Sequence, residues 1–375
     1  MMERNTFPGK ILHFLKSEAV LVISLVLAAA SMFLVPPDAA YAEYVNFEVL
    51  GLLLCLMAAV AGLRQAGLFE LLAKGLTRLT RNGKVLGLLL TAACFVLSAF
   101  VTNDVALITF VPFTVALLGT EDRDRLIGAV VMETVAANLG SLSTPIGNPQ
   151  NLLIYDTYGL GAGEFFSLSL PVAGLCLVFT AVASLLVLKR GADIAPAEEK
   201  GGLQKFPAVR AAALFILCVL TVLRVLDWKI TLAVTLLALM AFDRKLFGKI
   251  DWGLLVTFVG FFVFVGNLAR VEAVRGFVEM LLEGRVMVTS ALISQVVSNV
   301  PAAAMLTAFT EDWRGVFLGV NLGGLGTLIA SMASLISYRL YGAAPKAAKG
   351  RYMAIFTLVN FALLAVLLVI ANLIW

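Results

Sequence analysis

The chain has 375 residues, of which 61% are hydrophobic and only 14% are charged, and its mean hydropathy is +0.98. Soluble domains carry about 25% charged residues, so this composition excludes a set of soluble domains and requires an integral membrane protein. The net charge of +4 comes from lysines and arginines in loops. It therefore indicates membrane topology, and we expect no nucleic acid among the partners.

Apolar windows predict the membrane spans in chain order, because a spanning helix needs about 20 residues. Direct spans are predicted over 19–37, 46–63, 165–188, 252–269 and 352–375, with a hairpin of two modest spans over 211–223 and 230–242. Lysine and arginine are frequent before the first span, in 64–84, in 189–210 and in 243–249, and absent from 38–48 and 156–164. Since cytoplasmic loops carry this excess, we expect nine full spans, a cytoplasmic N-terminus and an external C-terminus.

Four further apolar windows are interrupted by polar residues, glycine or proline. Windows 85–118 and 286–310 break at Thr102-Asn103-Asp104 and Ser298-Asn299, and predict helical hairpins that enter and leave on one side. Windows 126–157 and 315–340 predict discontinuous spans. Unwound backbone survives in hydrocarbon only where protein or a water-filled cavity satisfies it, and paired breaks in two halves point to a transporter binding site. We therefore predict an all-α polytopic membrane protein, an inverted-repeat secondary transporter with two re-entrant hairpins and two discontinuous helices.

The two halves are expected to divide the chain at a charged segment that is rich in glycine and proline. Residues 1–190 form the first repeat, 191–208 a cytoplasmic linker and 209–375 the second, inverted repeat. Segment 268–285 precedes the second hairpin as 64–84 precedes the first, but its arginines are balanced by glutamates. Loss of the positive bias is expected if the second copy faces the opposite side of the membrane.

The broken segments contain the candidate ligand-binding groups. Free N–H groups at half-helix ends attract anions, and carbonyls with Ser, Thr and Asn oxygens suit sodium. Small residues could instead serve only close helix packing, but the duplication of the whole pattern favours binding. The candidate substrate- and ion-binding residues are Thr102, Asn103, Asp104, Asn138, Gly140, Ser143, Thr144, Pro145, Gly147, Asn148 and Asn151 in the first half, and Ser298, Asn299, Asn321, Gly323, Gly324, Gly326, Thr327, Ser331 and Ser334 in the second.

Asp104 and Glu133 are the carboxylates placed deepest in apolar sequence, and both are proton-coupling candidates. A carboxylate inside the membrane is costly and indicates function by default. Asp104 at a hairpin tip is the better candidate for cation or proton coupling, whereas a hydrogen bond to a neighbouring helix explains Glu133 equally well. Arg64 is expected to reach toward lipid headgroups. The single histidine, His13, offers no metal site, so we expect no cofactor or metal beyond a transient sodium ion or a proton as coupling ion.

The motif from Asn138 to Asn151, with Thr144-Pro145-Ile146-Gly147-Asn148-Pro149-Gln150-Asn151 at its centre, resembles the first discontinuous-helix motif of the ion transporter superfamily. That group includes divalent-anion/sodium symporters, citrate transporters, arsenite exporters and one class of sodium/proton antiporters. The resemblance covers residues 20–375. It implies inverted repeats, opposed re-entrant hairpins, a scaffold with a transport domain, and a homodimer moving by an elevator-like shift.

The hairpin tips depart from one branch of that superfamily. The dicarboxylate branch has Ser-Asn-Thr at both tips, while this chain has Thr102-Asn103-Asp104 and Ser298-Asn299-Val300. Asn103-Asp104 before an apolar helix is more similar to the arsenite-exporter and antiporter branches. The tip residues therefore do not assign the chain to one branch of the superfamily.

These features predict a secondary active transporter, not an enzyme, that moves a small anion (a carboxylate or an inorganic oxyanion) across the cytoplasmic membrane with sodium or protons. A sodium/proton antiporter and an arsenite-type efflux permease are the alternatives. A channel fits less well, because two opposed hairpins suit alternating access. An intramembrane enzyme would need a nucleophile and base or metal ligands in the membrane core. The expected partners are a small anionic substrate, the lipid bilayer and a second copy of the chain.

Overall fold

The computed structural model describes residues 18–118, 123–189 and 202–375, which form helices joined by turns, with no β-strand among them. The basic N-terminal segment, residues 119–122 and most of the expected linker 191–208 lie outside the described residues. The helices of the first half are α2 (Ala19–Ser31), α3 (Tyr41–Tyr44), α4 (Phe47–Gln65), α5 (Leu68–Thr77), α6 (Gly83–Val101), α7 (Asn103–Leu118), α8 (Arg123–Gly140), the 3-10 turn η2 (Ser141–Ser143), α9 (Pro149–Thr157) and α10 (Ala162–Val187).

The second half begins inside the expected linker, because α11 starts at Lys205. Its helices are α11 (Lys205–Val222), α12 (Trp228–Phe242), η3 (Arg244–Lys249), α13 (Trp252–Ala269), α14 (Glu272–Leu282), α15 (Val286–Val297), α16 (Asn299–Leu306), α17 (Trp313–Leu322), α18 (Met332–Gly342) and α19 (Lys349–Ile374). Several of the helices in the chain have a short polar N-cap residue. Asn46, Asp227 and Asp251 each accept a backbone N–H of the following first turn, which satisfies a donor that a helix start leaves free.

Seven helices of the described chain are long and apolar enough to cross a membrane. They are Phe47–Gln65, Gly83–Val101, Arg123–Ser143, Ala162–Val187, Lys205–Val222, Trp252–Ala269 and Lys349–Ile374. The chain is thus a polytopic membrane protein, but the expected nine full spans also included shorter helices. The expected span 19–37 is helical only to Ser31, because the run continues into Pro36 and Pro37, and α12 has 15 residues.

Both expected hairpins contain a break at the expected residue. Thr102 ends α6 with φ 74° and ψ 150°, and Ser298 ends α15 with φ 78° and ψ 153°. Positive φ is uncommon outside glycine, particularly for a β-branched threonine. Two non-glycine residues therefore adopt the same unusual backbone conformation, each directly before a tip asparagine.

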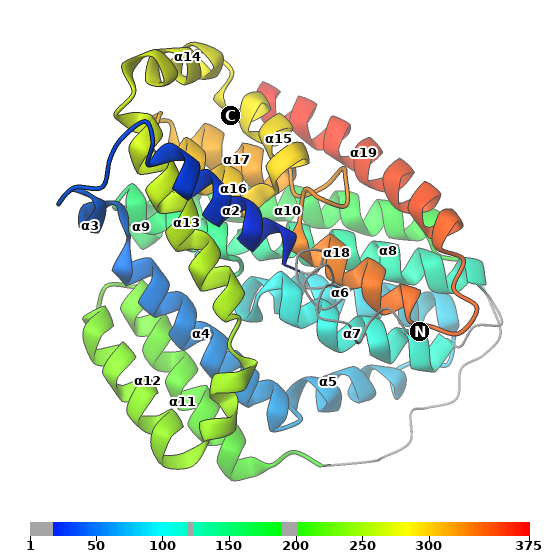
Figure 1. Cartoon of the computed structure of the whole chain (residues 1–375). Coiled ribbons are helices and arrows are strands. Elements are labelled where there is room, and N and C mark those ends of the chain that lie inside the picture. The colour runs from blue at the N-terminus through cyan, green and yellow to red at the C-terminus, as the bar shows by residue number, and fades with distance from the viewer. Residues whose placement is uncertain (1–17, 119–122, 190–201) are drawn as a thin grey trace, which may run out of the picture.

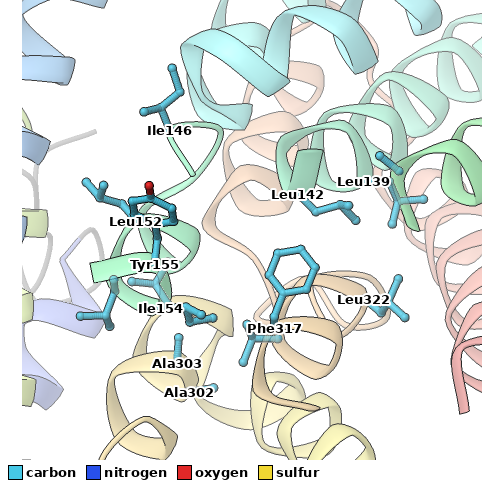
Figure 2. Packing of buried hydrophobic residues seen from close by; sticks show 14 of the residues in the cluster. Leu139, Leu142, Ile146, Leu152, Ile154, Tyr155, Ala302, Ala303, Phe317 and Leu322 are labelled. Carbon is cyan, nitrogen blue, oxygen red and sulfur yellow. The ribbon is translucent and has the colours of Figure 1, made fainter. Parts of the chain in front are cut away.

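The helices pack in two groups (Figure 1). One group contains α2, α4, α11, α12 and α13, and the other contains α6–α10 and α15–α19. Helix α8 lies at the centre of the second group, buried from Arg125 to Gly140 against α6, α7, α10, α18 and α19. Around the breaks the packing is apolar: Figure 2 shows Leu142 and Ile154 from the first half in one cluster with Ala303 and Phe317 from the second. The two broken segments consequently share a single core.

Candidate functional site

The two broken segments correspond position by position. Four polar residues of the first segment each have a counterpart 183 positions later in the chain. The pairs are Asn138 with Asn321, Thr144 with Thr327, Asn148 with Ser331, and Asn151 with Ser334. All four positions of each segment are among the predicted site residues, so their contacts can be compared directly between the halves.

Asn138, at the end of α8, takes its hydroxyl partners from the second half. Its Oδ1 accepts a hydrogen bond from Ser331 Oγ at 2.9 Å, and its Nδ2 donates to Ser334 Oγ at 3.1 Å. The same amide also lies 3.4 Å from the Gly324 carbonyl oxygen. The first helix break is therefore bonded to the residues that follow the second break.

Asn321, at the end of α17, has the equivalent partners in the first half. Its Oδ1 accepts from Asn148 Nδ2 at 3.0 Å, and its Nδ2 donates to Asn151 Oδ1 at 2.8 Å and to the Phe317 carbonyl at 2.8 Å. Asn321, Asn148 and Asn151 are all buried. Because the equivalent positions exchange equivalent bonds, the two broken segments clasp each other about a common centre. We call this set of bonds the reciprocal clasp.

The hairpin tips lie against the breaks. Asn103 Oδ1 accepts the Asp104 N–H at 3.0 Å, and Asn299 Oδ1 accepts the Val300 N–H at 2.9 Å, so the two tip amides have the same orientation. Asn103 Nδ2 also donates to Asn138 Oδ1 at 3.2 Å. The first tip thus joins the reciprocal clasp. The second tip instead bonds the loop after its own break, through the Asn299 N–H and the Ala330 carbonyl at 2.9 Å.

A threonine ties each break to its hairpin in the same way. Thr144 Oγ1 donates to the carbonyl of Ala99, and Thr327 Oγ1 donates to the carbonyl of Gln295 at 3.0 Å. Ala99 and Gln295 each lie four positions before the tip asparagine. The hairpin and the break of each half are therefore connected by an equivalent bond.

The remaining predicted residues shape the breaks. Gly140 lies against α6, where an added Cβ would be 2.1 Å from the Phe95 carbonyl oxygen. Gly147 and Pro145 are buried in the turn before α9, and Ser143 Oγ donates to the Gly140 carbonyl at 2.7 Å. Gly323 is buried at the end of α17. These residues permit close approach of backbone segments, so steric fit explains them without a ligand contact.

A cavity of about 610 Å³ lies between the two groups of helices. Thr102, Asp104 and Asn148 line it from the first tip and break, and apolar residues of α4 line it from the other group. Its exposed charged residues are Arg64, Glu70, Lys249 and Asp251. Asp104 Oδ1 is buried and has no hydrogen-bond partner among the described residues. The cavity therefore extends from charged, exposed residues to Asp104, a carboxylate with one buried oxygen that has no partner among the described residues.

The second tip and Glu133 lie away from this cavity. Its described lining contains neither Ser298 nor Asn299. Glu133 is completely buried on α8, and its Oε1 accepts a hydrogen bond from Thr114 on α7. That contact supports a structural role for Glu133, as an attachment of α7 to α8. Of the two proton-coupling candidates, only Asp104 has access to the cavity.

Sequence reasoning missed several residues of the site. Ser141 lies within the quoted motif and accepts from Asn148 Nδ2 at 3.0 Å. Gln295 is a polar residue in an apolar helix, four positions before a tip asparagine, and that spacing was an available signal. Arg64 lines the cavity, although a headgroup contact was expected for it. Within the described ranges no group of three His, Cys, Asp or Glu side chains is placed to hold a metal ion.

Comparison with known proteins identifies relatives over most of the chain. The family model described as citrate transporter matches residues 11–312. The inner membrane protein YbiR of Escherichia coli is 33% identical over 297 residues, which cover 76% of this chain and 77% of that protein. A protein of Methanocaldococcus jannaschii named as an uncharacterized transporter is 32% identical over 284 residues, with coverage of 74% and 77%. The silicon efflux transporter LSI3 of Oryza sativa subsp. japonica is 33% identical over 117 residues, which cover 31% and 24%.

Proposed function

We propose a function from one premise: the chain belongs to the citrate transporter family. The family and the transporter names of its relatives make it a membrane transporter. We propose that it is a secondary active transporter that moves a small anion, either a carboxylate or an inorganic oxyanion, with sodium or protons as the coupling ion. Residues 1–190 and 209–375 would form inverted repeats, and α6–α7 and α15–α16 would form re-entrant hairpins.

The observation that carries this proposal is the reciprocal clasp beside the cavity that ends at Asp104. Broken helices facing each other near the middle of a membrane protein are the usual site of substrate and coupling ion. Asp104 Oδ1 lacks a partner among the described residues. A buried carboxylate oxygen without a partner can take up a cation or a proton, so one unsatisfied acceptor lies next to the two breaks.

The charges around the cavity supply a reason for coupling. Arg64 and Lys249 line the cavity, and neither has an ion-pair partner in the described part of the chain. They can contact an anion directly, but Glu70 and Asp251 balance their charge, and Asp104 leaves the lining with a net negative charge that repels an anion. Sodium or a proton on Asp104 removes that repulsion. Anion and cation would therefore bind together, as symport requires.

The decisive experiment uses the purified chain in proteoliposomes. A panel of labelled carboxylates and inorganic oxyanions is offered under imposed sodium and proton gradients. Accumulation of one anion, driven by either gradient, is the expected result. Absence of accumulation for every anion under both gradients would overturn the proposal for the tested classes.

A sodium/proton antiporter is the second candidate, and the open carboxylate of Asp104 favours it. An antiporter needs only one such group that sodium and protons share in turn. The same vesicles distinguish the two functions, because sodium-for-proton exchange without any added anion would replace the leading proposal. The name of the rice relative suggests efflux, so an arsenite-type efflux permease is tested by release of anion from preloaded vesicles.

Orientation and assembly belong to the same proposal. Helix α5 and the turn η3, which contribute Glu70 and Lys249 to the cavity, are followed by or contain Arg78, Arg81, Arg244 and Lys245. Connecting segments of this charge are usually cytoplasmic. We therefore place the open cavity toward the cytoplasm of a cell membrane, with the C-terminus external and a second copy as partner. Single cysteines at Arg123 and Asp312 should label from the inside and the outside, respectively. Labelling of both from outside would contradict the inverted arrangement.

A further inference from the structure

One side chain, Gln295 on α15, bonds three backbone groups of the second break. Its Nε2 donates to the carbonyl oxygens of Gly323 at 2.7 Å and Leu325 at 3.0 Å. Its Oε1 accepts the N–H of Thr327 at 2.9 Å. Unwound backbone in a membrane protein must find such partners within the protein. Gln295 thus satisfies groups that would otherwise bond water or a ligand.

The first half has no equivalent of this side chain. Ala99 occupies the corresponding position, four residues before Asn103. Two carbonyls of the first break are bonded instead from within the same broken segment, because Asn151 Nδ2 donates to the carbonyls of Ser141 at 3.2 Å and Thr144 at 3.0 Å. Ser169 of α10 donates to a third, the Ser143 carbonyl, at 3.0 Å. The first break is therefore closed by side chains of α9 and α10, whereas a hairpin side chain closes the second break.

The glycines of the second break fit this arrangement. Gly326 has φ +99°, and an added Cβ would lie 2.2 Å from Gln295 Oε1. An L-residue with a side chain rarely adopts that conformation, and here it would also displace the amide. The segment 323–326 is consequently shaped around the Gln295 side chain.

We infer that Gln295 is a positioning residue, which holds the second break and the second hairpin together as one rigid unit. Among the described residues, the first hairpin is joined to its break only by the Thr144–Ala99 and Asn103–Asn138 bonds and has no counterpart of Gln295. Its tip also carries side chains that line the cavity, so it is the tip that moves when the site opens. This inference rests on the proposed function for its meaning in transport. The rigidity that it assigns to residues 323–327 can be measured without any substrate.

Amide hydrogen exchange of the purified full-length chain tests the inference. Gln295→Met keeps the size of the side chain but removes all three bonds, and Gln295→Glu keeps only the acceptor for the Thr327 N–H. Gln204→Met is the matched control, because Gln204 is exposed and makes no side-chain cap bond to α11.

With Gln295→Met, peptides covering 323–331 should exchange about tenfold faster or more, as expected for the loss of several hydrogen bonds. Peptides covering 141–151 should remain unchanged. Gln295→Glu should accelerate exchange at 323–331 at least as much as Gln295→Met, because a carboxylate oxygen would face the Gly323 and Leu325 carbonyls in place of the donor. Wild-type exchange at 323–331 would overturn the inference. Equal acceleration throughout the chain would also overturn it, because it would show a general loss of stability.

Transport then separates this inference from the proposed function. In proteoliposomes, Gln295→Met should raise KM at least about fivefold while Vmax falls less, because the second break no longer presents its binding groups in place. An unchanged KM would refute the positioning role. If the wild type transports nothing while the exchange result holds, the proposed function fails and the rigid second unit stands.

Discussion

The reciprocal clasp can be tested by removing both partners of one of its bonds. Asn148 and Asn321 are only 1% and 2% exposed, and Asn148 Nδ2 donates to Asn321 Oδ1 at 3.0 Å. Asn321→Ala removes three side-chain hydrogen bonds, leaves Asn151 Oδ1 without this partner and leaves Asn148 Nδ2 bonded only to Ser141 Oγ. Hydrogen bonds between membrane helices are each worth about 0.6 kcal/mol on average and at most about 1.7. We therefore expect Asn148→Ala and Asn321→Ala each to lose about 2–4 kcal/mol of unfolding free energy, since each unsatisfied buried group adds about 1–3 kcal/mol.

The double variant measures the interaction energy of the Asn148–Asn321 bond. Asn148→Ala with Asn321→Ala should cost about 0.5–2 kcal/mol less than the sum of the two single changes, because their shared bond can be lost only once. Reversible unfolding in mixed micelles, followed by tryptophan fluorescence, supplies the free energies. Asn148→Ala with Thr221→Ala is the control pair, because Thr221 bonds Thr231 in the other helix group. Additive costs for Asn148 and Asn321 would refute the clasp as an energetic unit.

Three further changes address the tips and the second break. Asp104→Asn should abolish gradient-driven accumulation, because it removes the charge and keeps the shape; an unchanged dependence of transport on pH and sodium would exclude the coupling role. Asn103→Ala and Asn299→Ala should each remove most transport from a folded protein, since a tip amide offers both a donor and an acceptor; normal uptake in both would reduce the tips to packing elements. Gly326→Ala should lower the unfolding free energy by about 1–3 kcal/mol, and a wild-type unfolding midpoint would contradict the contact with Gln295.

The breaks were predictable from sequence because their signals are local. Thr102-Asn103-Asp104 and Ser298-Asn299 interrupt apolar runs, and the helices end at Thr102 and Ser298 as expected. The resemblance to the ion transporter superfamily is confirmed by the family match. A motif of this kind can be read from the chain alone, since its residues are neighbours in sequence.

The pairing between halves could not be predicted in the same way. The bond from Ser331 to Asn138 joins residues 193 positions apart, and the local sequence of neither segment indicates this contact. Arg64 shows the same limit for a charged residue, because a side chain at a helix end can reach headgroups or a cavity. Whether Arg64 lines a cavity depends on how α5, α13 and the first tip pack near the end of α4. Glu133 is a third example, since its contact with Thr114 depends on how α7 lies against α8.

The reciprocal clasp also bears on how such a chain could arise. Asn138 and Asn321 obtain hydroxyl and amide partners from opposite halves, so a half alone would hold a buried amide without them, at a cost of several kcal/mol in hydrocarbon. Two identical halves would satisfy each other, because every donor position in one faces its acceptor position in the other. Asn148 corresponds to Ser331, and both donate to the asparagine of the other half. Asn151 corresponds to Ser334, and both accept through an oxygen.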